Sequence, residues 1–298
     1  MARSRPRGLL SIFLACVGCA WSGRREHLPT AEEYPEDVVR RTSFPAGGDL
    51  GWRISALSTP RASPAPWRIV VVTGAPSWAE YWSPVLAALP QDREMVVVDR
   101  PGFGSSEPAQ CVPSLDDQAT ALEPLLEAGP GQRVLLVGQS YGAAIATLMA
   151  ARNQERISGL VLLSGFFGRA GPTARLLIGL GRRLAGFIPR DLRHAALETS
   201  GQLLQLNPVF KLLNREPLLI TFIHGDRDDF APIGIARAIA HSTLAPARFI
   251  EVRGAGHFLN EASPEQLLAC LETAIHRRGG LRQQRSLQPA PRSLKLAS

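Results

Sequence analysis

The chain has 298 residues, 45% of them hydrophobic, which is enough to bury one sizeable core and to carry an inserted lid. Its formal net charge is +7 at pH 7, but residues 1–23 and 277–298 carry nine of the basic residues and none of the acidic ones. The region between these two ends is about neutral, and aromatic residues make up only 6% of the chain. This distribution argues against a nucleic-acid-binding protein.

Residues 1–23 have the pattern of an export signal. Three arginines precede the apolar run "GLLSIFLACVG", which is too short to span a bilayer as a mature helix but matches a signal-peptide core. Cys16 and Cys19 close this run, and each follows a small residue, as the lipidated cysteine of a bacterial lipoprotein does. A lipoprotein leader and an ordinary secretory signal both remain open. Either one predicts export to the periplasm, to the outer membrane or out of the cell.

Short runs of valine, isoleucine and leucine follow the leader and alternate with helical patterns. They end in glycine or a polar residue, as buried parallel strands do. The runs occupy 67–74, 93–100, 133–139, 157–165, 218–225 and 247–254. Two antiparallel strands are expected before them, within residues 37–58. The pattern predicts an α/β fold with a doubly wound, mostly parallel sheet, whose core spans residues 24–165 and 217–276.

Helix signals lie between these runs. Ser114 is an N-cap candidate for a helix that ends near Gly129, and Ser263 caps the final helix. Residues 277–298 lack apolar periodicity, which predicts a disordered basic tail. Cys111 and Cys270 are the cysteines that remain after the leader; small buried hydrophobic residues are the favoured interpretation, and a single disulfide is left open.

Residues 166–216 interrupt the alternation. About fifty residues stand where one crossover helix would suffice, and they contain three or four amphipathic helical stretches. An insertion after the sixth strand, above the carboxyl edge of the sheet, predicts a helical cap over a binding site. The alternative is a large crossover with packing duties only. The arginines of this segment are expected to be solvated.

The stretch "RVLLVGQSYGAAIATLMA" passes from strand to helix through Ser140, which is flanked by Gly138 and Gly142. One interpretation is a serine N-cap with glycines that let the chain bend. The other is a nucleophile elbow, in which a strained serine projects from the carboxyl end of the sheet. Small neighbours are then needed because strand and helix approach closely, and the helix N-terminus supplies N–H groups for an oxyanion.

A serine nucleophile needs a base and a group that orients the base. His257 follows the last predicted strand and precedes the final helix, so it can reach back to Ser140 as a general base. The orienting carboxylate must come from Asp226, Asp228 or Asp229, which share one loop. Asp228 stands three residues after a glycine and four before a proline.

This order and these surroundings resemble the α/β-hydrolase superfamily, in which a "G-x-x-D-x-x-x-P" segment bears the acid and a "G-x-G-H" segment the histidine. The resemblance covers roughly residues 37–276 and implies the triad Ser140, Asp228 and His257. The segment "VVVDRPGFGSSEP" resembles the loop after the family's fourth strand, whose residues shape the turn beside the site and are structural.

The segment "VVTGAPSWAEYW" resembles the family's oxyanion loop, which a His-Gly pair usually opens. By that match the backbone N–H groups of Ala75 and Tyr141 form the oxyanion hole, whereas Pro76 has no N–H to give. Thr73 departs from the family because it occupies the position of the histidine that normally organises the loop.

Serine with an oxyanion hole implies acyl chemistry: attack on a carbonyl, an acyl-enzyme, then water. The expected activity is hydrolysis of carboxylic esters with an apolar acyl or alcohol part. Lactonase, thioesterase, amidase, C–C hydrolase and perhydrolase activities of the same fold remain open, as does acyl transfer. A non-catalytic exported binding protein is the alternative of a different class. No cofactor and no metal site are expected. The expected partner is a small-molecule substrate, and a lipoprotein leader would add a membrane reached through the N-terminal lipid.

Overall fold

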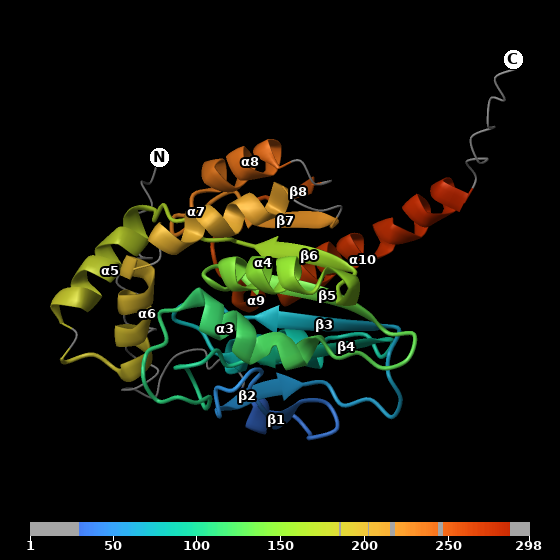
Figure 1. Cartoon of the computed structure of the whole chain (residues 1–298), viewed down its shortest axis with the longest axis horizontal. Helices are drawn as coiled ribbons and strands as arrows, with labels where there is room; N and C mark the ends of the chain where they lie inside the picture. The colour runs from blue at the N-terminus through green and yellow to red at the C-terminus, as the bar shows by residue number, and fades with distance from the viewer. Residues whose placement is uncertain (1–29, 185, 202, 215–217, 244–246, 287–298) are drawn as a thin grey trace, which may run out of the picture.

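One eight-stranded sheet organises the molecule (Figure 1). The computed structural model describes residues 30–286 except 185, 202, 215–217 and 244–246. The strand order is β1-β2-β4-β3-β5-β6-β7-β8. Strands β1 (Arg40–Pro45) and β2 (Arg53–Ser58) are antiparallel. The parallel strands are β3 (Trp67–Val72), β4 (Arg93–Val98), β5 (Arg133–Gln139), β6 (Gly159–Leu163), β7 (Ile220–Gly225) and β8 (Ala247–Val252).

This architecture confirms the predicted doubly wound, mostly parallel α/β sheet. The central strands are apolar on both sides because a layer of helices covers each face of the sheet. Along β3, Val70 and Val72 pack into one layer, and Ile69 and Val71 pack into the other. This alternation is the period of two that a strand imposes on its side chains.

Helices cover both faces of the sheet. One layer contains α3 (Leu115–Leu122), α4 (Gly142–Arg152), α7 (Leu203–Lys211) and α8 (Ile233–Ser242). The other contains α2 (Ser83–Ala87), α9 (Leu259–Ala262) and α10 (Pro264–Ser286). Five short 3-10 helices complete the described part: η1 (Ala31–Glu33), η2 (Ala79–Trp82), η3 (Glu123–Leu126), η4 (Gln154–Arg156) and η5 (Leu212–Asn214).

The ends of two helices bear on the sequence predictions. Ser114 caps α3 as expected, with its Oγ accepting a hydrogen bond from the Asp117 N–H at 3.1 Å. Helix α10 continues through residues 277–286, where the sequence predicts a disordered tail. Leucine, arginine and glutamine are good helix formers, and extending an existing helix is far easier than starting one. Residues 287–298 lie outside the described residues.

The predicted leader, with Cys16 and Cys19, also lies outside the described residues. Within the residues that the structure describes, no helix combines the length and apolarity needed to cross a bilayer. Cys111 and Cys270 are both free thiols, so the disulfide left open from the sequence does not form.

The segment between β6 and β7 divides into two parts. Helices α5 (Pro172–Arg183) and α6 (Arg190–Gly201) pack against each other and project past the carboxyl ends of the strands (Figure 1). Helix α7 instead packs on α4, and its Leu206 and Val209 are buried in the core. The cap above the sheet is therefore the α5–α6 pair, and α7 belongs to the helix layer of the core.

Candidate active site

Ser140 lies at the turn between β5 and α4 with a backbone φ of 51°. A residue with a Cβ is strained in this left-handed region. A Cβ on Gly138 would lie 2.7 Å from a Cα of α4, and a Cβ on Gly142 would lie 2.3 Å from the carbonyl oxygen of Val72. Both glycines are thus required by the close approach of strand and helix. The N-cap of α4 is Tyr141. Ser140 therefore has the geometry of a nucleophile elbow, not that of a helix cap.

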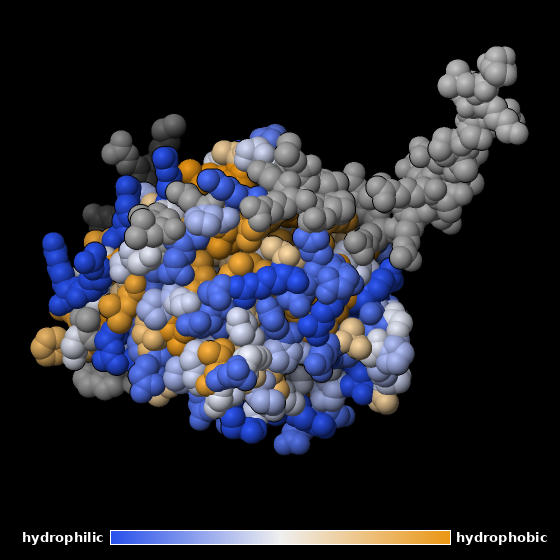
Figure 2. All heavy atoms as spheres, in the orientation of Figure 1, coloured by the Kyte–Doolittle hydropathy of each residue, from blue (hydrophilic) through white to orange (hydrophobic). Residues whose placement is uncertain are grey.

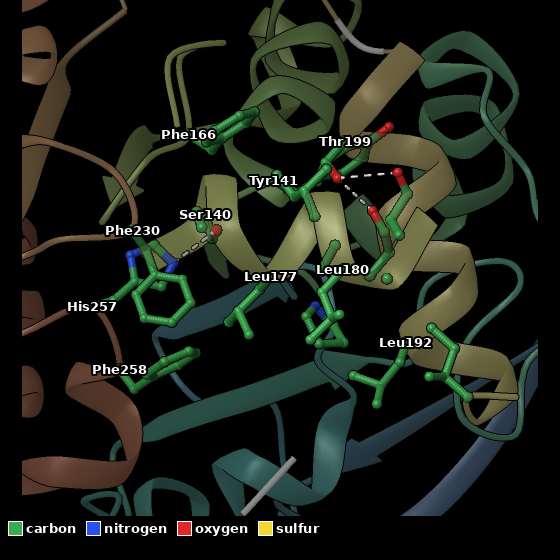
Figure 3. A pocket seen from close by; sticks show the side chains of 18 of the residues that line it. Ser140, Tyr141, Phe166, Leu177, Leu180, Leu192, Thr199, Phe230, His257 and Phe258 are labelled. Atoms are coloured by element: carbon green, nitrogen blue, oxygen red, sulfur yellow. Dashed lines mark hydrogen bonds between the residues drawn. The ribbon is translucent and has the colours of Figure 1, made fainter. Parts of the chain in front are cut away.

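The imidazole of His257 joins Ser140 and Asp228 in one hydrogen-bonded chain. Nε2 of His257 lies 2.9 Å from Oγ of Ser140 (Figure 3), and Nδ1 lies 2.8 Å from Oδ2 of Asp228. A carboxylate only accepts hydrogen bonds, so Nδ1 carries the ring proton. Nε2 of the neutral ring then presents a lone pair to the serine hydroxyl. The structure brings together the three residues that the sequence singled out, from the loops after β5, β7 and β8.

The carboxylate of Asp228 is held in its ionised form. Burial acts to raise its pKa, but the charge of His257 and hydrogen bonds from His224, His257 and the Ala231 N–H outweigh burial and lower it well below its ordinary value. Oδ1 accepts from the N–H groups of Phe230 at 2.9 Å and Ala231 at 2.8 Å. Nε2 of His224 lies 3.1 Å from Oδ2. Asp228 can therefore stabilise an imidazolium on His257 without taking its proton.

Two aromatic rings enclose the catalytic histidine candidate. Phe230 stacks on His257 with ring centroids 5.2 Å apart, and Phe258 meets the same ring edge-on at 5.0 Å. Ser140, Asp228 and His257 are only 9%, 7% and 6% exposed. Because water is largely excluded, each charge interaction in the chain is stronger than it would be at the surface.

Ala75 and Tyr141 line the same cavity as Ser140 and His257. Tyr141 is the N-cap of α4, so its N–H lies at the positive end of the helix dipole. Among the backbone hydrogen bonds of the described residues, neither the Ala75 N–H nor the Tyr141 N–H is a donor. Both groups are thus available to an oxyanion formed at Ser140.

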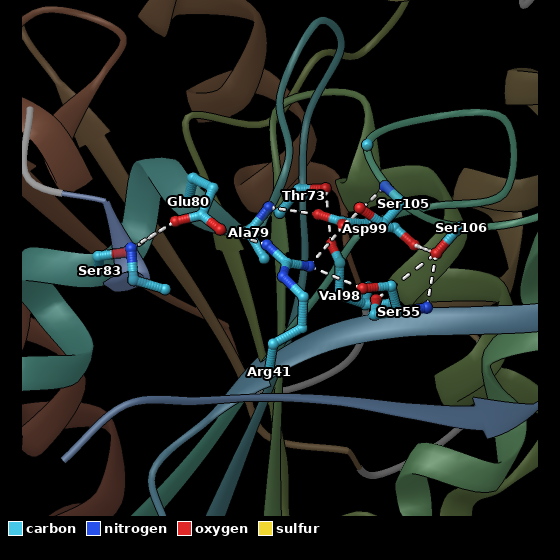
Figure 4. Close-up of polar contacts among 12 residues, drawn as sticks. Arg41, Ser55, Thr73, Ala79, Glu80, Ser83, Val98, Asp99, Ser105 and Ser106 are labelled. Atoms are coloured by element: carbon cyan, nitrogen blue, oxygen red, sulfur yellow. Dashed lines mark hydrogen bonds and ion pairs between the residues drawn. The ribbon is translucent and has the colours of Figure 1, made fainter. Parts of the chain in front are cut away.

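The loop that carries Ala75 is anchored at both ends, although Thr73 replaces the family's usual histidine. The Thr73 hydroxyl donates to the Val98 carbonyl at 3.0 Å, and the Ala79 N–H donates to Oδ1 of Asp99 at 2.7 Å (Figure 4). Asp99 is completely buried. The carbonyl of Val98, the last residue of β4, and the carboxylate of Asp99 therefore fix the conformation of this loop in place of the histidine.

An apolar cavity of about 120 Å³ opens beside Ser140, between the core and the cap (Figure 3). From the core it is lined by Pro76, Phe166, Phe230 and Phe258 in addition to the site residues. The cap contributes Ala174, Leu177, Ile178, Leu180, Gly181, Leu184, Ile188, Leu192, Ala195, Ala196 and Thr199. In the described part of the chain no lysine, arginine, aspartate or glutamate lines it. The cavity thus suits an uncharged, apolar group.

The arginines of the cap face away from this cavity. Arg169, Arg175, Arg182 and Arg183 are exposed. Figure 2 shows hydrophilic side chains gathered along the outer edge of α5. These four charges are therefore solvated, as expected from the sequence. Arg190 of α6 differs, because it is half-buried and its Nη2 donates to the Gly104 carbonyl oxygen at 2.7 Å.

The other two carboxylates of this loop, those of Asp226 and Asp229, have different hydrogen-bond partners. Asp226 Oδ1 accepts from the Gly254 N–H at 2.7 Å, and Asp229 Oδ2 accepts from the Thr173 hydroxyl in the first turn of α5. Of the three carboxylates, only that of Asp228 is hydrogen-bonded to His257 among the described residues. No cluster of three or more potential ligands for a metal ion occurs among the described residues.

The sequence showed no sign of one buried polar group of the site, His224, and placed a second, Arg100, only among the structural residues of the turn beside the site. His224 is the last residue but one of β7, and its Nε2 lies 3.1 Å from Oδ2 of Asp228. Arg100 pairs with Glu198 of α6 under the cap, and both side chains are fully buried. The motif "VVVDRPGFGSSEP" was the available signal for Arg100, but its partner Glu198 lies 98 residues further along the chain.

A doubly wound sheet with a strained serine between strand and helix, and a histidine and a carboxylate after its last two strands, defines an α/β-hydrolase fold. A family model described as "alpha/beta hydrolase fold" matches residues 68–219, about half of the chain. The chain belongs to that family.

Relatives share short segments with this chain. A 2-hydroxy-6-oxononadienedioate/2-hydroxy-6-oxononatrienedioate hydrolase of Pseudomonas putida is 37% identical over 100 residues, which cover 33% of this chain and 35% of the relative. A 2-hydroxymuconate semialdehyde hydrolase of a Pseudomonas species is 34% identical over 108 residues, covering 36% of each protein. The match thus spans only about a third of these curated relatives.

Solved structures are similar over most of the chain. A 2-hydroxy-6-oxo-6-phenylhexa-2,4-dienoate hydrolase from a Rhodococcus species has a TM-score of 0.63 at 16% identity, covering 80% of this chain and 98% of the other. A thermophilic esterase from Thermogutta terrifontis has a TM-score of 0.61 at 19% identity, covering 82% and 98%. At these identities the likeness shows the fold alone.

Proposed function

We propose that this protein is a serine hydrolase that cleaves uncharged carboxylic esters through an acyl-enzyme on Ser140. The observation that carries the proposal is the buried hydrogen-bonded chain from Ser140 through His257 to Asp228, beside two free backbone N–H groups. A nucleophile, a base, an orienting carboxylate and oxyanion donors are the four parts that acyl transfer needs.

The reaction follows from the geometry. Nε2 of His257 takes the hydroxyl proton as Oγ of Ser140 attacks the ester carbonyl. The oxyanion of the tetrahedral intermediate accepts hydrogen bonds from the N–H groups of Ala75 and Tyr141. His257 then protonates the leaving alcohol, and the acyl-enzyme forms. Water, activated by the same imidazole, releases the carboxylic acid and restores the serine.

The lining of the cavity favours an apolar ester over a charged substrate. The names of several relatives refer to dienedioates, which carry two carboxylates. A carboxylate buried without a cationic or hydrogen-bonding partner is strongly disfavoured, and within the described residues no lysine or arginine lines the cavity. C–C bond hydrolysis is the second candidate, because the relatives that match about a third of this chain at 37% and 34% identity are named as hydrolases of such dienedioate and semialdehyde compounds.

The test is a fluorophosphonate probe followed by a substrate panel. The wild-type protein is expected to be labelled at Ser140, and Ser140→Ala is expected to remain unlabelled. On aryl esters of graded acyl length, Ser140→Ala should lose about four to six orders of magnitude in rate. Absence of labelling in correctly folded wild-type protein would favour a binding protein without turnover. Labelling with activity on vinylogous diketones but not on esters would favour C–C hydrolysis.

We also propose that the protein is exported and that a lipid on Cys19 or Cys16 attaches it to a membrane. The arginines and short apolar run of residues 1–23 support this proposal. Mass spectrometry of the mature N-terminus tests it. A diacylglyceryl cysteine would support lipidation, and an unmodified N-terminus after residue 19 would support a secretory signal. Full-length protein retained in the cytosol would contradict both.

A further inference from the structure

Arg100 is a fully buried arginine beside the candidate active site. It directly follows Asp99 in the loop after β4, and its guanidinium contacts three separate segments. Nε and Nη2 donate to the carbonyl oxygen of Gly74 at 3.2 and 2.9 Å. Nη1 donates to Gln118 of α3 at 2.6 Å, and both terminal nitrogens reach the carboxylate of Glu198 in cap helix α6 at 3.3 and 3.1 Å.

The contact with Gly74 bears on the oxyanion hole through the geometry of the peptide bond. The carbonyl of Gly74 and the N–H of Ala75 belong to one planar peptide group, in which they point in opposite directions. Two hydrogen bonds from Arg100 on the carbonyl therefore fix the direction of the Ala75 N–H. This peptide sits directly against the nucleophile, because a Cβ on Gly74 would lie 2.9 Å from the Cβ of Ser140.

Arg100 also touches the second oxyanion residue. Its guanidinium carbon lies 4.8 Å from the centroid of the Tyr141 ring and 4.3 Å from that of Phe103. A guanidinium over an aromatic face is attracted by the ring. Arg100 thus contacts both residues whose N–H groups would bind the oxyanion, through the peptide of Gly74 and through the ring of Tyr141.

Glu198 connects this arginine to the cap. Along α6, Asp191 Oδ2 accepts from the Gly104 N–H at 3.2 Å, and His194 Nδ1 lies 2.8 Å from the Gly102 carbonyl oxygen. Glu198 is one turn further on, and Gln118 donates to its Oε1 at 2.9 Å. One face of α6 is therefore docked on the loop after β4, and its last contact is the carboxylate that holds Arg100.

We infer that Arg100 is a positioning residue for the oxyanion hole, and that Glu198 makes this positioning depend on the docked cap helix α6. The inference rests on the proposed serine-hydrolase function. A buried ion pair contributes little to stability compared with apolar residues of the same volume, so stability alone does not account for this pair. Arginine suits the role because its planar fork can donate to the carbonyl and to the carboxylate at once, whereas lysine has a single nitrogen.

The test compares Arg100→Lys, Arg100→Met and Glu198→Gln with the wild-type protein. The first readout is the rate at which a fluorophosphonate labels Ser140. In that reaction the Oγ–P bond forms as the P–F bond breaks, fluoride leaves, and the hydroxyl proton passes to His257. Loss of one oxyanion donor typically costs 100- to 1,000-fold. Arg100→Met is therefore expected to lower the labelling rate by about 100-fold, and Arg100→Lys and Glu198→Gln by about tenfold.

A second readout separates positioning from general stability. Affinity for a trifluoromethyl ketone, which forms a tetrahedral adduct with the serine, should fall in parallel with the labelling rate. Affinity for the corresponding alcohol, which forms no adduct, should change less than threefold. Arg93→Gln is the matched control, since Arg93 is also buried and paired with a glutamate, Glu272, on α10. It should lower the melting temperature without lowering the labelling rate of the folded protein.

Three outcomes decide the matter. Parallel losses of labelling rate and adduct affinity, with restored activity in the order Lys above Met, support the inference. Equal labelling rates for wild-type and Arg100→Met protein would overturn it while leaving the serine-hydrolase proposal intact. Failure of the wild-type protein to react would instead reject the proposed function. If Arg100→Met does not fold, the labelling rates of Arg100→Lys and Glu198→Gln relative to the wild-type protein decide instead: tenfold losses support the inference, and unchanged rates overturn it.

Discussion

His224 and Asp228 stand four residues apart at the end of β7, with Nε2 of the histidine 3.1 Å from Oδ2 of the carboxylate. The same Nε2 lies 2.7 Å from the carbonyl oxygen of Ala231, which can only accept, so this nitrogen carries a proton. Asp228 Oδ2 therefore faces N–H groups of two histidines, His257 on the side of the nucleophile and His224 beneath it.

The first prediction concerns this second histidine. His224→Leu should lower kcat by about 10- to 100-fold, because a hydrogen bond to a charged group contributes about 1.5–3 kcal/mol and its loss frees the carboxylate to rotate. His224→Gln retains an N–H donor and should keep most of the activity. Steady-state kinetics on an aryl ester measure both. An unchanged kcat in His224→Leu would show that His257 and the backbone hold Asp228 by themselves.

The second prediction ranks the three carboxylates of the loop. Asp228→Asn should lower turnover by about four orders of magnitude, because an amide does not hold the imidazole in the tautomer that the reaction needs. Asp226→Asn and Asp229→Asn should be mild, since these residues bond to Gly254 and Thr173. The same assay applied to all three variants checks the ranking. Greater sensitivity at Asp226 would contradict the assignment of the acid.

The third prediction concerns acid stability. The folded-state pKa of Asp228 lies below its ordinary value, so its ionisation stabilises the folded protein fully above the unfolded-state pKa of about 3.9. This stabilisation is lost as the pH falls from there toward the lower folded-state pKa, by up to about 1.4 kcal/mol per pH unit. The wild-type protein should therefore destabilise more steeply than Asp228→Asn as the pH falls from about 4 to about 2, below the unfolded-state pKa.

Melting temperatures across this range measure the difference, and Asp226→Asn serves as the control because its carboxylate is exposed. Parallel melting curves for wild-type and Asp228→Asn protein would show that the carboxylate is not ionised preferentially in the folded state.

The fourth prediction concerns the elbow. An alanine Cβ at position 142 would lie 2.3 and 2.6 Å from the backbone oxygens of Val72 and Thr73, neither of which can rotate away. Gly142→Ala should therefore destabilise the fold by about 1–3 kcal/mol and displace the serine. Gly179→Ala is the matched control, since a Cβ there meets nothing within 4 Å and alanine favours a helix by about 1 kcal/mol. Thermal unfolding and labelling of Ser140 test both; a Gly142→Ala protein as stable and reactive as wild type would refute the packing argument.

The sequence by itself determined the sheet and the order of the site residues. Valine-rich runs specify strands buried on both faces, and glycines at positions 138 and 142 mark an approach that only glycine permits. The resemblance of its surroundings to the family's "G-x-x-D-x-x-x-P" segment distinguished Asp228 from Asp226 and Asp229. These features are local, because each depends on residues within a few positions of one another.

Only the tertiary structure decided which distant polar groups meet. His224 beneath Asp228, and Arg100 between Gly74 and Glu198, depend on how strands and cap pack. Pairing of buried charges carries no local sequence period, since either partner alone looks like any charged residue. The division of residues 166–216 into an α5–α6 cap and a core helix α7 was likewise set by tertiary contacts. Amphipathic helices have similar patterns whether they cover a cavity or a sheet, because both bury one apolar face.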